Sequence, residues 1–195
     1  MSAPHPLACA LAIVAAMSLA GLAHACWMAS RHSASFRIPI DGNRHWRGAR
    51  IFGANKTLAG FMAITPAAGA AFALLGALRD TMPTWLDAGL WPLAPGQLFA
   101  LGCWAGFWFM AGELPNSFLK RRIGLAPGAI PRGGWRRLAC LVLDRIDSVL
   151  ALLLALAVLV PMHWATWLWV LAIGPAVHLA FSSVLFLTGV KARAA

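Results

Sequence analysis

Two aspartates at the start of an apolar helix are the side chains that point most directly to chemistry. Asp144 and Asp147 stand three residues apart in "LDRIDSVLALLLALAVLV", Leu143 to Val160. Residues at this spacing share one helix face, and a carboxylate at the mouth of a membrane helix requires a partner or water. Two such carboxylates suit a hard cation such as Mg²⁺, whose other ligands are water and substrate phosphate. The alternative is structural ion pairs with nearby arginines, such as Arg122, Arg136 and Arg145.

A third acidic residue lies in "GELPNSFLKRR", residues 112–122. Glu113 is expected inside or at the edge of the membrane, where it needs a cation or a metal. Pro115 is expected to interrupt the helix and to free carbonyl groups there. The basic residues Lys120, Arg121 and Arg122 follow; such a run is ordinarily a solvated or headgroup-facing patch, but it could also neutralise a phosphate.

A glycine-rich basic loop is the third candidate feature, with the sequence "IPIDGNRHWRGARIFGANKTLAGF" from Ile38 to Phe61. Gly48 and Gly53 have the glycine spacing of a P-loop. Lys56 and Thr57, however, follow Gly53 by three residues rather than one, and no strand is expected before it, so the loop is not a Walker A motif. It can still hold phosphates through backbone N–H groups. The alternative is an ordinary positively charged loop of a membrane protein.

The composition predicts the elements that must position these residues. The chain is 61% hydrophobic and 11% charged, with a mean hydropathy of +0.73, which is too apolar for a soluble domain of this length. We therefore expect an all-α, multi-pass integral membrane protein with a single domain, residues 1–195. Five segments are long enough to span a bilayer at about 20 residues each: Leu7–Met28, Leu58–Leu78, Leu98–Phe118, Leu138–Val160 and Trp164–Thr188.

The positive charges predict the orientation of these segments. The net charge is +10, and Lys and Arg concentrate in the first loop, in the third loop with the start of the fourth helix, and in the tail at Lys191 and Arg193. Arg79 is the exception. The positive-inside rule places the basic parts in the cytoplasm, so no nucleic-acid partner is needed to explain the charge. An outer aromatic belt is expected from Trp85, Trp91, Trp164, Trp167 and Trp169.

The three motifs together resemble the CDP-archaeol synthase family. "PIDGNRHWRGARIFGANKTLAGF", "GELPNSFLKRRIGLAPG" and "LDRIDSVL" are similar to its loop, acid–lysine–arginine and aspartate-x-x-aspartate motifs, in that order. The last also resembles the bacterial CDP-diacylglycerol synthases. The resemblance covers most of the chain. It implies a five-helix membrane enzyme that uses Mg²⁺ to transfer CMP from CTP to a lipid phosphate and releases pyrophosphate.

The resemblance also implies roles for individual residues. The CTP and phosphate contacts would be Asp41, Arg47, Asn55, Lys56, Thr57 and Ser117. The catalytic cations would be Lys120, Arg121 and Arg122, and the metal ligands Asp144, Asp147 and Glu113. Family members commonly have aspartate where this chain has Glu113, and residues 129–142 form a longer stretch than in archaeal members. The lipid, ester or isoprenoid ether, and the oligomeric state therefore stay open.

Two other function classes remain as alternatives. A transporter could use the three carboxylates as an ion or proton relay, although no paired halves of the kind common in transporters are visible. A non-catalytic lipid-binding protein would explain the basic loops. It would not explain the aspartate pair.

Overall fold

Five long helices dominate the computed structural model, which describes residues 1–127, 129 and 133–187, with residue 178 and residues 181–187 described by their backbone only. The helices are α1 (Pro6–Ala29), α2 (Leu58–Ala77), α4 (Pro95–Arg122), α5 (Gly134–Leu159) and α6 (Trp164–Leu187). Each coincides with one of the predicted segments. Helix α4 extends about one turn further at both ends than predicted, and α5 begins about one turn earlier.

The connections contain short elements that the sequence pattern did not predict. Between α1 and α2 lie the 3₁₀ helix η1 (Arg31–Phe36) and an antiparallel hairpin of β1 (His45–Trp46) and β2 (Ala49–Arg50). Between α2 and α4 lie η2 (Arg79–Thr81) and the one-turn helix α3 (Thr84–Asp87). The predicted all-α class therefore holds for the body of the molecule, with this hairpin added.

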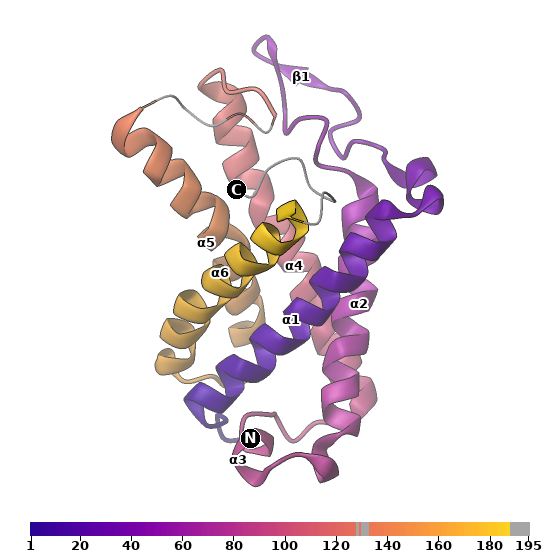
Figure 1. The fold of residues 1–195 in the computed structure, drawn as a ribbon, viewed down its shortest axis with the longest axis vertical. Helices are drawn as coiled ribbons and strands as arrows, with labels where there is room; N and C mark the ends of the chain where they lie inside the picture. Colours follow the sequence, from indigo (N-terminus) through magenta and orange to yellow (C-terminus); the bar gives the residue numbers. More distant parts are fainter. Residues whose placement is uncertain (128, 130–132, 188–195) are drawn as a thin grey trace.

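The helices form a closed ring. Helix α2 packs on α1 and α4, α4 on α5, and α6 on both α5 and α1, and α1 and α6 cross in front of the others in Figure 1. The α2–α4 contact is close because its residues are small. A Cβ at Gly102 would stand 2.5 Å from the Ala68 carbonyl oxygen, and a Cβ at Gly69 would stand 2.5 Å from Cys103 Sγ. Small residues let membrane helices pack backbone to backbone in this way.

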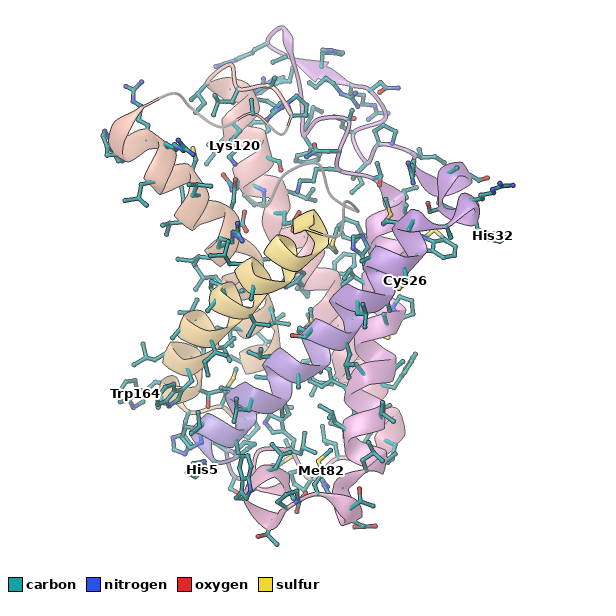
Figure 2. All side chains as sticks on the ribbon, viewed as in Figure 1. His5, Cys26, His32, Met82, Lys120 and Trp164 are labelled. Atoms are coloured by element: carbon teal, nitrogen blue, oxygen red, sulfur yellow. The ribbon has the colours of Figure 1, made fainter. Side chains whose placement is uncertain are left out.

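Both basic connections lie at the same end of the ring. Figure 1 shows the β1 hairpin, the end of α4 and the start of α5 at one end, and the N-terminus, α3 and the α5–α6 turn at the other. The labelled side chains follow the same division, with His32 and Lys120 toward the first end and His5 and Trp164 at the second (Figure 2). This agrees with the predicted grouping of the loops. Arg132, Lys191 and Arg193, which the prediction also included, lie outside the described residues.

The end opposite the basic loops corrects one predicted feature. Trp91 was expected near this end as part of an aromatic belt; it lies at this end, but it is only 1% exposed and so belongs to the core. Its Nε1–H donates to the Pro161 carbonyl oxygen at 2.8 Å, and Arg79 donates to the Trp91 carbonyl oxygen at 2.7 Å. Trp91 thus ties the turn between α5 and α6 to the connection before α4. Trp85 and Trp164 at this end are exposed, as expected.

The membrane-spanning prediction is confirmed only in part. Among the described residues, α1 and α2 are long and apolar enough to cross a bilayer, and α6 has a shorter apolar stretch at Trp164–Val177. Helices α4 and α5 carry the charged residues of the candidate site at the end with the basic loops. The apolar helices indicate a membrane protein, while five spans remain a prediction.

Candidate functional site

The three predicted metal ligands lie along the α4–α5 interface. The Asn116 side-chain amide on α4 donates to Asp144 Oδ1 at 2.6 Å and to Asp147 Oδ2 at 2.8 Å on α5. The Ser148 hydroxyl is 3.2 Å from both Glu113 Oε1 and Asp147 Oδ1. Asn116 and Ser148 therefore link all three carboxylates into one polar row.

A glycine allows the two helices to approach at this row. A Cβ at Gly112 would lie 2.4 Å from the Ala151 Cβ and 2.8 Å from the Asp147 carbonyl oxygen. Both distances are too short for a side chain, so glycine alone fits without a shift. Gly112 therefore sets the separation of α4 and α5 next to Glu113.

The predicted helix break at Pro115 is wrong. Helix α4 runs without interruption from Pro95 to Arg122 with Pro115 inside it. Proline removes only one helical hydrogen bond, the one to the carbonyl four residues earlier, and α4 is supported on two sides by α2 and α5. The continuous helix keeps Glu113, Asn116 and Lys120 on neighbouring turns.

Two lysines neutralise the ends of the polar row. Lys56, from the loop before α2, forms an ion pair with Glu113, and Lys120, from the last turn of α4, forms one with Asp144. Asp144 thus forms an ion pair, as in the structural alternative considered for it, but its partner is a lysine on the neighbouring helix and not an arginine. The Lys56 pair also brings the glycine-rich loop, 57 residues away in sequence, onto α4.

Asp41 shapes the glycine-rich loop from within. Its fully buried carboxylate accepts hydrogen bonds from Arg50 Nη2 at 2.6 Å and from the backbone N–H groups of Asn43, Phe52 and Gly53 at 3.0–3.2 Å. Burial would raise the pKa of this carboxyl, but the bonds from Arg50 and the three N–H groups outweigh burial and hold the pKa well below its ordinary value. Asp41 therefore stays ionised and turned into the loop.

Arg121 is a buried cation facing that loop. Its side chain is 8% exposed, and its Nε and Nη1 have no hydrogen-bond partner among the described residues. Nη1 lies 3.6 Å from the position that a Gly53 Cβ would take, and Asn55 Oδ1 lies 3.3 Å from the same position. Gly53 has φ +115, a conformation that favours glycine. Because a buried charge without a partner is costly, this arrangement is suited to an anion.

The other residues predicted to belong to the site differ in where they lie relative to Arg121 and the carboxylates. Thr57 occupies the N-cap position of α2 without a capping hydrogen bond from its side chain, and it pairs with Pro39 through the backbone. Ser117 is half-buried on α4 beside Asn116. Arg47, at φ +51 in the hairpin turn, lies over the Trp46 ring at 4.7 Å. Arg122 donates to hairpin carbonyl groups. The structure thus gathers Lys56, Lys120 and Arg121 around the loop and the carboxylates, and directs Arg47 and Arg122 into the hairpin.

Asn116, Ser148 and Gly112 are site residues that the sequence reasoning missed. Asn116 is three residues after Glu113, and so on the same helix face; Ser148 directly follows Asp147. These spacings were available signals. Gly112 lies close to α5 because of the way in which α4 and α5 pack. No pattern in this sequence predicts that packing.

An apolar cavity of about 150 Å³ adjoins the carboxylates. Four helices, α1, α4, α5 and α6, contribute to its wall. Its apolar lining includes Met17, Phe109, Leu152 and Val170, and its polar lining includes Glu113, Asp144 and Ser148. A molecule with an apolar chain and a charged head would match both parts.

The donor atoms of the polar row fit Mg²⁺ in kind. Carboxylate, amide and hydroxyl oxygens are hard ligands, and Mg²⁺ is usually held by one or two carboxylates together with substrate phosphates. Within the part of the chain that the structure describes, no three acidic, histidine or cysteine side chains converge closely enough to form a metal cluster by themselves. The row therefore fits a site that a phosphate ligand would complete.

The sequence of the chain is similar to those of known proteins. A family model described as "CarS-like: CDP-archaeol synthase" matches residues 24–193. The CDP-archaeol synthase of Halobacterium salinarum is 35% identical over 161 residues, which cover 78% of this chain and 81% of that protein. The CDP-archaeol synthase of Halorubrum lacusprofundi is 38% identical over a match that covers 65% of this chain and 63% of that protein. That of Pyrococcus furiosus is 33% identical over a match that covers 46% of this chain and 48% of that protein. No solved structure matches the chain.

Proposed function

Since the chain belongs to the CDP-archaeol synthase family, we propose that it is a CTP-dependent cytidylyltransferase that transfers CMP to a membrane lipid phosphate and releases pyrophosphate. The observation that carries this proposal is the buried guanidinium of Arg121, which faces the loop of Gly53 and Lys56 and whose Nε and Nη1 have no hydrogen-bond partner among the described residues. A triphosphate supplies the anion that this cation lacks, and charge-assisted hydrogen bonds from arginine to phosphate are among the strongest in proteins.

The nucleotide side of the site consists of the loop and the basic end of α4. Lys56 and Lys120 are each neutralised by a carboxylate in the structure. Phosphate oxygens would compete with Glu113 and Asp144 for these ammonium groups. Asn55, Thr57 and Ser117 would add uncharged hydrogen bonds, and Asp41 would act by holding the loop in shape.

The lipid side is the apolar cavity. Its wall of apolar side chains from α1, α5 and α6 would accommodate part of a chain, while Glu113, Asp144 and Ser148 mark the end where the phosphate would lie. This orientation brings the lipid phosphate to the same polar row as the triphosphate. Ester-linked and isoprenoid ether lipids share this headgroup chemistry.

The chemistry needs alignment and charge neutralisation more than proton transfer. The second pKa of a phosphate monoester is about 6, so the lipid phosphate is largely a dianion near neutral pH and needs no general base. One of its oxygens forms a bond to the α-phosphorus of CTP, and the bond from that phosphorus to the pyrophosphate oxygen breaks. Lys56, Lys120 and Arg121 would stabilise the negative charge that collects on the leaving group.

Asp144, Asp147 and Glu113 are the residues that would hold Mg²⁺. Bound there, Mg²⁺ would supply further neutralisation and orientation of the phosphates. Asn116 and Ser148 would hold the carboxylates in one row and fix their rotamers. CTP is a cytosolic nucleotide, so the proposal places the site at the cytoplasmic side of a multi-pass membrane protein, in agreement with the basic loops at that end.

The test is a reconstituted assay with labelled CTP. The purified protein in liposomes would be supplied with a panel of phosphatidates and isoprenoid ether-lipid phosphates. We expect Mg²⁺-dependent transfer of label to at least one lipid class and stoichiometric pyrophosphate. The Arg121→Gln variant should lose most of this activity. No transfer to any member of the panel by folded protein would refute the proposed function.

A further inference from the structure

Arg122 makes contacts unlike those of its neighbour Arg121. Its guanidinium donates to the carbonyl oxygens of Trp46, of Ala49 at 3.0 Å and of Arg50 at 2.6 Å. These three acceptors belong to both strands of the hairpin, more than 70 residues earlier in the chain. One side chain at the end of α4 thus holds the whole hairpin.

An aromatic stack reinforces this attachment. Trp46 of β1 stacks on Phe118 of α4, with ring centroids 5.5 Å apart and an interplanar angle of 27°. The Arg122 guanidinium lies 5.2 Å from the Trp46 ring and 5.0 Å from the Phe118 ring. Phe118 and Arg122 are four residues apart and share a helix face. The hairpin therefore rests on one face of the last turns of α4.

A continuous series of contacts leads from this attachment to the phosphate-facing loop. Arg50, whose carbonyl accepts from Arg122, donates through its own side chain to Asp41. Asp41 in turn accepts from the N–H group of Gly53, and Arg121 Nη1 lies 3.6 Å from the position that a Gly53 Cβ would take. Two residues adjacent in sequence are thus connected to the loop: Arg121 faces it directly, and Arg122 is connected to it through the hairpin.

We propose that Arg122 is a positioning residue that clamps the hairpin to α4 and so holds Gly53 and Lys56 in register with Arg121. It acts on CTP binding through the hairpin and does not contact the substrate. The link to CTP rests on the proposed function. The forked geometry of guanidinium is needed to reach several carbonyls at once, and a lysine ammonium at this place retains the charge without the fork.

The clamp is tested first without any substrate. Arg122→Lys and Arg122→Gln would be compared with Arg136→Gln, which removes the same charge from an exposed arginine at the start of α5. Limited trypsin digestion reports opening of the hairpin at Arg44, Arg47 and Arg50. Because bonds to a charged donor are lost, we expect cleavage there about tenfold faster in both Arg122 variants than in wild type and in Arg136→Gln. Equal cleavage rates would overturn the clamp.

The second measurement is the dependence of turnover on CTP. Both Arg122 variants should raise the KM for CTP about tenfold, with the KM for lipid phosphate unchanged and kcat within about twofold at saturating CTP, as expected for a lost positioning interaction. A loss confined to kcat, or near-normal behaviour of Arg122→Lys, would overturn the positioning role. If wild type transfers no CMP at all, the proposed function fails, and the digestion still decides whether Arg122 clamps the hairpin.

Discussion

Charge is expected to matter more than shape at Asp144 and Asp147. Asparagine is nearly isosteric with aspartate and keeps one acceptor for Asn116, but it cannot neutralise a divalent cation. We predict that Asp144→Asn and Asp147→Asn each fold yet lose most CMP transfer at low Mg²⁺. Metal ligation contributes several kcal/mol, and about 3 kcal/mol is more than a hundredfold in rate. The measurement is activity per folded molecule across a Mg²⁺ titration.

Purely structural aspartates would give the reverse result. If Asp144 serves only to pair with Lys120, its replacement should lower expression and thermal stability, while the molecules that fold remain active. Near-normal turnover in both asparagine variants at low Mg²⁺ would therefore exclude the metal assignment.

Lys56 connects the glycine-rich loop with α4, and its loss should weaken nucleotide binding. We predict that Lys56→Ala reduces CTP affinity by roughly 1.5–3 kcal/mol, the range for a hydrogen bond to a charged group. Lys56→Arg, which keeps the charge, is the matched control and should lose less. Calorimetric titration with CTP and Mg²⁺ measures both, and unchanged affinity in folded Lys56→Ala would remove this loop from the site.

The Asp41 carboxylate should make the loop sensitive to acid. Its pKa in the folded protein lies below the ordinary value of about 3.9, so its stabilisation is complete above that value and is lost as the pH falls toward the folded pKa. We predict that Phe52 and Gly53 amides lose hydrogen-exchange protection below about pH 4. In Asp41→Asn they should be poorly protected even at pH 7. Equal protection of both proteins at pH 7 would contradict this role.

At the level of residues, the sequence predicted which charged side chains would belong to the site better than it predicted the groups that they would contact. The carboxylates and lysines that meet at the α4–α5 interface were all predicted, because charges near apolar segments are conspicuous. Asp41 and Arg122 were assigned to substrate, yet their hydrogen bonds go to the loop and the hairpin. Nothing in a one-dimensional pattern distinguishes an arginine that faces a phosphate from one that faces three carbonyl groups.

At the level of elements, α4 is the helix on which the site depends, and its glycines set its distances to neighbours. Gly112→Ala would bring a methyl group within 2.4 Å of the Ala151 Cβ, so α5 must shift and the polar row must widen. Overpacking of this kind costs about 1–3 kcal/mol. We predict a tenfold or greater loss of CMP transfer per folded molecule, measured in the liposome assay.

Gly96→Ala is the matched control on the same helix, because a Cβ at Gly96 meets nothing within 4 Å. It should leave both stability and activity close to wild type. Equal activity of Gly112→Ala and Gly96→Ala would show that the α4–α5 separation next to Glu113 does not limit the reaction.

The sequence predicted long helices well and short elements poorly. Apolar length locates α1, α2 and α6 without any knowledge of packing. The hairpin strands have two residues each, too few for an alternating pattern, and the turn has Arg47 at a positive φ where asparagine or glycine is preferred. The stabilisation of this hairpin comes from Asp41, Phe118 and Arg122, contacts that only the folded chain brings together.

At the scale of the whole molecule, the distribution of charge and the helix ring lead to one prediction about sidedness. The loop with the hairpin and the start of α5 lie at the same end, and the connection that contains α3 lies at the other (Figure 1). The first two are rich in arginine and lysine, whereas the third contains only Arg79. From the positive-inside rule we therefore predict that the hairpin end faces the cytoplasm, where CTP is found.

Single cysteines in a background without the native ones would test this arrangement with a membrane-impermeant maleimide. We predict that Ala88→Cys reacts in intact cells, whereas Asn43→Cys and Arg136→Cys react only after the membrane is permeabilised. Reaction of residues 43 and 136 in intact cells, with 88 protected, would place the carboxylate row away from cytosolic CTP and exclude the proposed reaction. Reaction of residues 43 and 136 on opposite sides would instead contradict the ring itself, because the Lys56–Glu113 and Lys120–Asp144 pairs require both loops at one end.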